Sequence, residues 1–382
     1  MVYMAGDNNL DSAALRDIAE MAQVGSSKKV HIVVQLDRDK DLLTRRFYIT
    51  RDGGYEKDCI VIFDETNTGD PNILENFILW AIHRYPARRY FLILWNHGGG
   101  WWEETSRQGS GVSGQRVKKP RAIFKKKSPT TKRNIAYDDT SGDALDNQEL
   151  KNVLSGVSQK IGRKIDILGM DACLMNMIEV AYQLKNCVQV MVGSEEEEPF
   201  DGWPYHKILH VLKNRPRSWP TTIAKMIVKE YIKSYRGKNQ NVTQSAFNLK
   251  RIGSIVQRLD VLSREIISSF QHRDAYRAVG SSWRKSPRFF WNNYVDLCSF
   301  AENLRQRSAQ QGIKKEAARL IRELKRGRRK AILHQAHLGK KVKDTHGMSV
   351  YFPSAWINPK YRELDFYKDC RWGKFLDRYL LS

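Results

Sequence analysis

Long apolar runs and cysteines are both scarce in this sequence. No window offers the roughly 18 consecutive apolar residues that a membrane-spanning helix needs. The five cysteines (Cys59, Cys173, Cys187, Cys298 and Cys370) are scattered, odd in number and form no CxxC pair. This pattern argues against a disulfide framework and against a cysteine-rich zinc site. We therefore expect no membrane span and at least one free thiol.

The start of this sequence also shows no signal-peptide pattern. The first residues, MVYMAGDNNL, lack the charged start and the long apolar stretch of such a peptide, so the sequence leaves the location of the protein open. The composition, 41% apolar and 28% charged residues, is typical of a globular protein. A chain of 382 residues is long enough to bury a sizeable core.

Acidic residues are fewer than basic ones, 42 against 65, which gives a formal net charge of +23. The stretch 106–134 holds ten Lys or Arg and no Asp or Glu, and RELKRGRRK at 322–330 is a second basic segment. Such charge admits a nucleic acid or an anionic surface as partner. However, the sequence has no recognised nucleic-acid-binding motif, and Phe124 is the only aromatic residue in 106–134. Binding to nucleic acid or an anionic surface therefore stays the alternative function, and nucleic acid is not the partner we expect.

The first half of the chain alternates two kinds of segment. Apolar, β-branched runs at 30–36, 90–95, 165–170 and 188–193 predict buried strands, and 45–50 followed by DGG predicts a hairpin. Apolar residues at three- and four-residue spacing predict amphipathic helices at 12–23, 72–85, 147–161 and 174–186. This alternation predicts an α/β fold whose mainly parallel sheet is covered on both faces.

The second half is predicted to be largely helical. Helical patterns occupy 221–235, 252–270 and 313–333, and strand-like runs at 243–249 and 348–353 could extend the main sheet or form a small one. We predict a catalytic core over 1–204 that contains a basic surface insertion at 106–134. The region 205–382 is then a mainly helical part that packs on this core.

Two strand ends carry the chemical signal. The strand YFLILW is followed by NHGGGW, so His97 lies at the carboxyl end of that strand. The strand IDILGM is followed by DACLM, so Cys173 lies at the corresponding point of its own strand. We also predict that Cys173 opens a helix. The carboxyl ends of parallel strands lie along one edge, where ligands bind. A thiol near an imidazolium and a helix N-terminus becomes a strong nucleophile. The amides of Gly98 and Cys173 are the expected donors to an oxyanion.

Each of these signals is weak when taken alone. A cysteine after an apolar strand is more often a small core residue, and GGG is often a tight turn. The other four cysteines lack a glycine-rich histidine context and are predicted to be buried small residues. His346 precedes a strand, so we expect it to lie away from the catalytic edge.

Several longer blocks resemble the clostripain family of cysteine peptidases. They are YMAGDNNLD, LWNHGGGW, GMDACLMNMIEVAY, SEEEEPFDGWPY, YVDL and HGMSVYFP, in the order in which that family carries similar blocks. The resemblance implies a caspase-like α/β/α sandwich, a catalytic dyad at His97 and Cys173, and cleavage after Arg or Lys of exposed peptide or protein segments. Because the family usually has more sequence before the first block, often with an export signal, the resemblance also implies a native N-terminus that is longer or starts differently. The intact dyad blocks oppose the further alternative of a catalytically silent scaffold.

Cleavage after a basic residue requires a carboxylate in the binding pocket, because a buried cation without a counter-charge is costly. The resemblance points to Asp171 and Asp201. The alternatives are a helix-capping role for Asp171 and a turn role for Asp201. The run 195–198 could also supply the charge, although we interpret it as a solvated acidic loop.

The resemblance further suggests calcium and self-cleavage. No cofactor is required for the chemistry itself, but related enzymes are typically helped by calcium, and GDNNLD offers Asp7, Asn8, Asn9 and Asp11 as oxygen ligands. A loop that caps the following helix is the simpler interpretation, and the sequence does not identify a metal site. Within the basic insertion, where such enzymes tend to be processed, Lys127, Lys132 and Arg133 are the predicted sites of self-cleavage, which is expected to activate the enzyme. An uncleaved basic tether that binds anions is the alternative.

Overall fold

The computed structural model of the chain describes residues 1–101, 135–290, 292–325 and 331–381. The strands are β1 (Val2–Gly6), β2 (Val33–Arg38), β3 (Leu43–Tyr48), β4 (Cys59–Asp64), β5 (Phe91–Trp95), β6 (Ile135–Asp138), β7 (Asp143–Leu145), β8 (Ile165–Asp171), β9 (Val188–Gly193), β10 (Val242–Asn248), β11 (Arg288–Phe289), β12 (Tyr294–Asp296), β13 (Ile332–Leu338) and β14 (Ser349–Tyr351). The α-helices are α1 (Asp11–Ala22), α2 (Pro71–Arg84), α3 (Asn147–Lys160), α4 (Ile178–Leu184), α5 (Tyr205–Asn214), α6 (Pro220–Ser234), α7 (Ile252–Ser268), α8 (Arg273–Lys285), α9 (Leu297–Arg307), α10 (Gln311–Lys325), α11 (Asp365–Asp369) and α12 (Trp372–Leu380). Short 3₁₀ turns occupy Leu249–Arg251, Lys340–Val342 and Pro359–Glu363.

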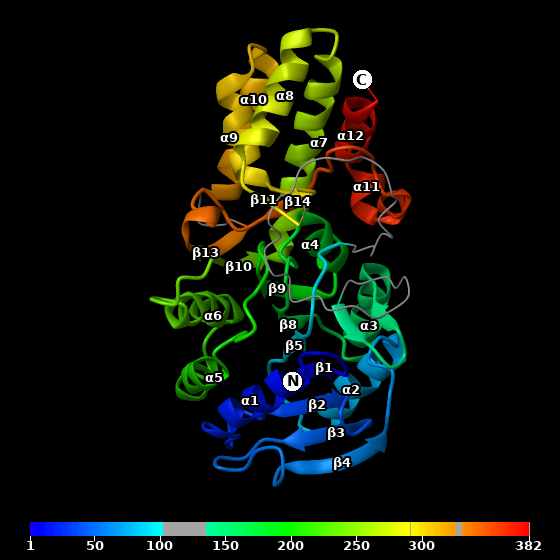
Figure 1. Cartoon of the computed structure of the whole chain (residues 1–382), viewed down its shortest axis with the longest axis vertical. Helices are drawn as coiled ribbons and strands as arrows, with labels where there is room; N and C mark the ends of the chain where they lie inside the picture. The colour runs from blue at the N-terminus through cyan, green and yellow to red at the C-terminus, as the bar shows by residue number, and fades with distance from the viewer. Residues whose placement is uncertain (102–134, 291, 326–330, 382) are drawn as a thin grey trace, which may run out of the picture.

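A nine-stranded sheet in the order β13-β10-β9-β8-β5-β1-β2-β3-β4 forms the centre of the structure (Figure 1). The five strands from β9 to β2 in this order run parallel, and an antiparallel pair extends each edge. Parallel strands require crossover helices, which the alternating first half of the sequence supplies. The predicted hairpin after 45–50 is confirmed as the β3–β4 pair.

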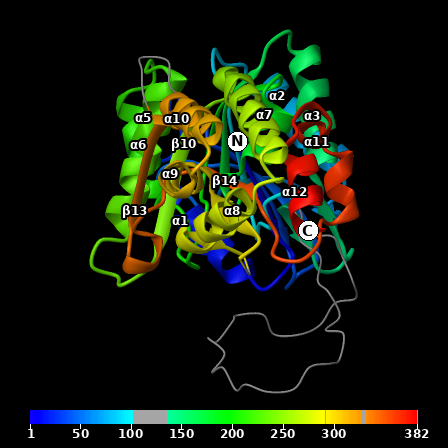
Figure 2. The same ribbon diagram turned by 90° about the horizontal axis from the view of Figure 1, so that it is seen from above.

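Helices cover both faces of this sheet (Figures 1 and 2). Alternate residues of one strand enter different cores: Leu92 and Leu94 of β5 pack with α2, α3 and α4, whereas Ile93 packs with α1, α5 and α6. This alternation follows from the two-residue repeat of a strand. The two buried layers explain why the parallel strands are continuous apolar runs. The predicted α/β/α sandwich is therefore confirmed.

The C-terminal half contributes helices α5 to α12 and two strands of the main sheet. The run at 243–249 is β10, next to β9, and the run at 348–353 contains β14 of a three-stranded sheet with β11 and β12. The prediction of one helix over 313–333 is wrong at its end: α10 is described as far as Lys325, and β13 begins at Ile332, inside the predicted range. β13 lies at the edge of the sheet and contains His and Gln residues, so its sequence lacks the continuous apolar run of a buried strand.

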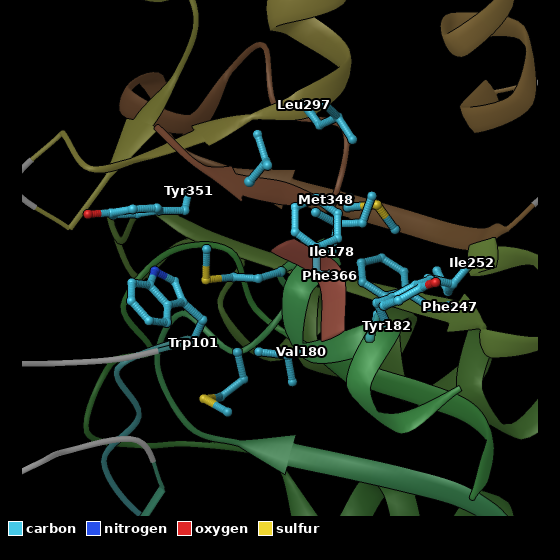
Figure 3. Packing of buried hydrophobic residues seen from close by; sticks show 14 of the residues in the cluster. Trp101, Ile178, Val180, Tyr182, Phe247, Ile252, Leu297, Met348, Tyr351 and Phe366 are labelled. Carbon is cyan, nitrogen blue, oxygen red and sulfur yellow. The ribbon is translucent and has the colours of Figure 1, made fainter. Parts of the chain in front are cut away.

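Helix α4 connects the catalytic edge to the C-terminal region. Ile178 and Tyr182 of α4 lie among Met348, Leu297 and Phe366 from the second half (Figure 3). One hydrophobic core thus joins the two halves on this face, and the domain boundary at 204/205 stays a prediction. Among the described residues, no helix is both long and apolar enough to cross a membrane.

Candidate active site

His97 and Cys173 follow two neighbouring parallel strands at the same level of the sheet. Strand β5 ends at Trp95 and β8 ends at Asp171, and these two residues pair across the strands. His97 and Cys173 each come two residues after this pair. The structure therefore places both side chains at the carboxyl edge, where open α/β sheets bind ligands.

Cys173 lies in a turn, and the prediction that it opens a helix is wrong. The next residue, Leu174, has a φ of 66°, which lies outside the right-handed helical region. Helix α4 begins only at Ile178 and has Met177 as its N-cap. The positive end of a helix dipole is therefore not adjacent to the sulfur. The alternative role of Asp171 as a helix cap is excluded for the same reason.

A backbone amide takes the place of the expected helix terminus. The N–H of Glu198 donates to the Sγ of Cys173, with 3.2 Å between nitrogen and sulfur. A hydrogen bond to sulfur favours its charged form over the neutral thiol. Leu174 donates its backbone N–H to the carbonyl oxygen of Glu196, at 3.3 Å, which holds the same two segments together. Glu198 is thus a site residue that sequence reasoning placed only in an acidic run.

His97 is oriented by Asn9, from the loop after β1. The Nε2 of His97 lies 2.7 Å from the side-chain oxygen of Asn9. If that amide oxygen is the acceptor, Nε2 carries the proton and Nδ1 is the basic nitrogen. Asn8 anchors the loop, because its Nδ2 donates to the carbonyl oxygens of Ala5 (3.0 Å) and Tyr137 (2.9 Å). The sequence offered Asn9 as a calcium ligand and gave no sign of this contact.

The glycine after His97 permits close approach of the two strand ends. A Cβ on Gly98 would collide with the backbone carbonyl oxygen of Cys173 and lie 3.1 Å from its nitrogen. Gly98 also forms an isolated antiparallel bridge with Ile135. The glycine is therefore needed for packing of backbone against backbone. Its amide and that of Cys173 lie on adjacent segments, as an oxyanion site would require.

Asp171 forms the buried charged part of the site. It is 5% exposed, and its carboxylate accepts a hydrogen bond of 2.7 Å from the hydroxyl of Tyr205. Burial raises the pKa of Asp171 to about 6, and burial together with the neighbouring Asp171 carboxylate raises the pKa of Glu198 well above its ordinary value. The two carboxyl groups lie within hydrogen-bonding reach of each other, so they share a proton more readily than they carry two charges.

Asp201 lies in a different environment. Its side chain is 62% exposed and forms an ion pair of 2.8 Å with Lys238. The following residue, Gly202, has a φ of 54° and lies next to Asp171, because a Cβ on this glycine would be 3.3 Å from the Asp171 carboxylate oxygen. In this structure the Asp201 carboxylate is thus balanced by a surface lysine, and its chain segment closes over Asp171.

The interpretation of 195–198 as a solvated loop is wrong. Glu195 is 1% exposed and Glu196 is 4% exposed, whereas Glu197 is exposed. The Oε2 of Glu195 accepts from the backbone N–H of Gly347 at 2.7 Å. Backbone hydrogen bonds and close packing at the end of β9 explain the burial of these carboxyl groups, which composition alone did not indicate.

The remaining cysteines have different roles. Cys187, Cys298 and Cys370 are buried as predicted, and burial raises the pKa of each thiol, which keeps it neutral. Cys59 is half-buried on an outer strand, so the prediction of full burial is wrong there. All five cysteines are free.

One group that combines Cys298, Glu302 and His346 has the residue types of a metal site. The Nζ of Lys325 already lies 2.6 Å from Glu302 and 3.3 Å from His346. An ammonium group thus already binds Glu302 and His346, and we interpret this group as an ion-pair cluster. The predicted cleavage sites Lys127, Lys132 and Arg133 lie outside the described residues.

Comparison with known proteins leads to the same family that the sequence motifs resemble. The family model described as the clostripain family matches residues 2–116 and 121–379. Clostripain of Hathewaya histolytica is 30% identical over 242 residues, which make up 56% of this chain and 41% of that protein. The match thus spans less than half the length of this relative.

Solved structures agree in fold. A secreted C11 cysteine protease from Bacteroides thetaiotaomicron, in complex with an irreversible peptide inhibitor, is 19% identical with a TM-score of 0.68, over 97% of this chain and 98% of that one. An inactive zymogen C11 protease from Parabacteroides distasonis is 18% identical with a TM-score of 0.67, over 97% and 96% of the two chains.

Proposed function

Because the chain belongs to the clostripain family of cysteine peptidases, we propose that it is an endopeptidase with His97 and Cys173 as its catalytic pair. The observation that carries this proposal is the position of the two residues after neighbouring strands. Each lies two residues beyond the paired residues Trp95 and Asp171, at the carboxyl edge of the sheet. The contact between the Glu198 amide and the sulfur supports it.

In the proposed reaction, His97 takes the proton of Cys173, and the thiolate attacks the peptide carbonyl carbon. The carbonyl oxygen becomes an oxyanion that accepts hydrogen bonds from the Gly98 and Cys173 amides. As the C–N bond breaks, His97 gives its proton to the leaving amine. Water then attacks the thioester with His97 as base, which releases the acid and restores the thiol.

The test is hydrolysis of short fluorogenic peptides that end in Arg, Lys, Asp or Leu. We expect Cys173→Ala and His97→Ala each to abolish hydrolysis, and the double variant to be hardly worse, because the pair acts as a unit. Cys59→Ala is the matched control, since it removes a half-buried thiol outside the site. Substantial hydrolysis by Cys173→Ala would overturn the proposal. An inactive parent chain would instead favour a silent scaffold.

Cleavage after Arg or Lys is the second part of the proposal. Asp171 lies two residues before Cys173, and Glu198 donates its backbone N–H to the sulfur, so the segments that carry this buried acidic pair adjoin the nucleophile. Tyr231 lies in the same region, where its hydroxyl is buried with no hydrogen-bond partner among the described residues. A substrate cation entering this region would supply a counter-charge to the two carboxyl groups. Asp201, on the chain segment that covers Asp171, contributes from the rim.

Self-cleavage in the basic insertion is the third part. The insertion lies between β5 and β6, and β5 pairs with β8, which follows the insertion in sequence. Strands from both sides of a cut at Lys127, Lys132 or Arg133 therefore share one sheet, so the two pieces should stay together. The relative described as an inactive zymogen shows that a precursor form occurs in this fold.

A denaturing gel and intact-mass measurement of the parent and of Cys173→Ala test self-cleavage. We expect fragments with termini inside 106–134 in the parent alone. A single intact chain in a fully active parent sample would exclude it.

A further inference from the structure

Four carboxylates that are far apart in the sequence converge beside the catalytic edge. Asp7 follows β1, Asp37 lies in β2, Glu65 follows β4 and Asp138 ends β6. Each offers one oxygen, and these oxygens all lie within 4.8 Å of one another. Asp7, Asp37 and Asp138 are 0% exposed, whereas Glu65 is half-buried and gives the cluster a route to solvent.

Three oxygens of this acidic cluster have no hydrogen-bond partner among the described residues. They are Oδ1 of Asp7, Oδ2 of Asp37 and Oε1 of Glu65, and each is buried. The opposite oxygens of the two aspartates are satisfied: Thr140 donates its backbone N–H to Asp7, and Thr44 donates its hydroxyl to Asp37. Each aspartate is thus held by one oxygen while its other oxygen stays unsatisfied.

Within the part of the chain that the structure describes, the cluster also lacks a compensating charge. Among the described residues, no Lys, Arg or His forms an ion pair with any of the four carboxylates, and the nearby Arg38 guanidinium is bound by Asp11 and Asp41 instead. Asp138 is surrounded by neutral donors, the backbone and hydroxyl of Thr68. Converging buried carboxylates without a cation are strongly unfavourable, because each loses its hydration and repels the others.

We propose that Asp7, Asp37, Glu65 and Asp138 form a binding site for one Ca²⁺ ion. Two oxygens on opposite sides of a Ca²⁺ ion at about 2.4 Å are about 4.8 Å apart, so the four oxygens fit one coordination sphere. Mg²⁺ requires oxygens at about 2.1 Å in near-octahedral geometry, which four carboxylates from separate segments match less well. The four described ligands are all carboxylates, with no nitrogen or sulfur among them, which disfavours zinc.

The site would act on the catalytic edge through the loop after β1. Asp7 precedes Asn9, the partner of His97, by two residues, and the carbonyl oxygen of Asp7 accepts the N–H of Asp139 at 2.8 Å. A Ca²⁺ ion would thus join this loop to the segment that follows the basic insertion. Of the residues that the motif GDNNLD offered, only Asp7 belongs to the site. Asn8, Asn9 and Asp11 bind other partners.

Calcium binding to the full-length Cys173→Ala chain tests the inference without using activity, so its failure is separate from failure of the peptidase proposal. After removal of metals with EDTA, titration calorimetry should show one saturable Ca²⁺ site per chain, and Mg²⁺ should bind more weakly. Ca²⁺ should also raise the thermal midpoint. In the same background, Glu65→Gln should weaken Ca²⁺ binding at least about tenfold, because a charged ligand is lost.

The adjacent exposed carboxylate provides a matched control: Asp64→Asn should bind Ca²⁺ as the parent does. Asp37→Asn should lose binding, yet in EDTA it should unfold at a higher temperature than the parent, since repulsion within the cluster is relieved. If Asp37→Asn does not fold, Glu65→Gln decides, because no described residue hydrogen-bonds the unpartnered Glu65 oxygen. No saturable Ca²⁺ uptake, equal binding by Glu65→Gln and the parent, or tighter binding of Mg²⁺ would overturn the assignment.

Discussion

Removal of the charge on Asp171 should separate substrate recognition from catalysis. Asp171→Asn keeps the size of the side chain and an oxygen that can accept from Tyr205, so the fold should persist. What is lost is the negative charge of a residue that is 5% exposed and lies next to the nucleophile-bearing turn. Asp201→Asn provides the comparison between a buried and a rim carboxylate, because Asp201 is 62% exposed and already paired with Lys238.

The structure sets the expected magnitudes. Loss of one partner from a buried charge pair typically costs about 2 to 5 kcal/mol, which corresponds to a fall of about 30-fold to several thousandfold in kcat/KM for Arg peptides. Loss of an exposed pair costs at most about 1 kcal/mol, so Asp201→Asn should lower kcat/KM less than about fivefold. Citrulline peptides, which have the shape of Arg without its charge, should respond little to either change.

The assay compares kcat/KM for matched Arg and citrulline peptides, with the rate of thiol alkylation as a measure of Cys173 reactivity. Because burial raises the pKa of Asp171 to about 6, the preference for Arg should also shrink as the pH falls through 6 and the carboxylate is protonated. The ratio of the two substrates cancels titration of the dyad. If Asp171→Asn keeps the parent preference for Arg at neutral pH, the pocket assignment is wrong.

Three further changes test other parts of the structure. Asn9→Ala should lower kcat about tenfold with little change in KM, because His97 loses its hydrogen-bonding partner at 2.7 Å. Steady-state kinetics measure both constants, and an unchanged kcat would show that the contact does not position the imidazole ring. Gly98→Ala should abolish hydrolysis while unfolding stays cooperative, since its Cβ would collide with the Cys173 carbonyl oxygen; full activity would contradict the close approach. Burial raises the pKa of Glu179 from 4.5 to about 7, so the parent loses stability as the pH rises from about 4.5 to 7. Glu179→Gln should therefore exceed the parent by about 3 kcal/mol in urea unfolding at pH 8 and match it at pH 4, and equal stability at both pH values would refute this reasoning.

Local patterns were sufficient to predict the central strands and most of the covering helices. A strand buried on both faces requires a continuous run of apolar residues, and a helix buried along one side requires apolar residues at three- and four-residue spacing. The run 90–95 therefore predicts β5, and 252–270 predicts α7. β13 escaped prediction because an edge strand is buried less and tolerates His and Gln. The helix at 174–186 starts late because the turn at Leu174 depends on contacts with the segment after β9.

The sequence by itself determined the strand and helix order and the placement of His97 and Cys173 after apolar runs, since these depend on residues close together in the chain. The tertiary structure alone decided which distant groups serve them: the Glu198 amide on the sulfur, Asn9 on the imidazole, and the convergence of Asp7 with Glu65 and its neighbours. All three of these arrangements have the same physical cause. Sheet order and strand register bring these segments together, and neither is encoded by the periodicity of any one segment.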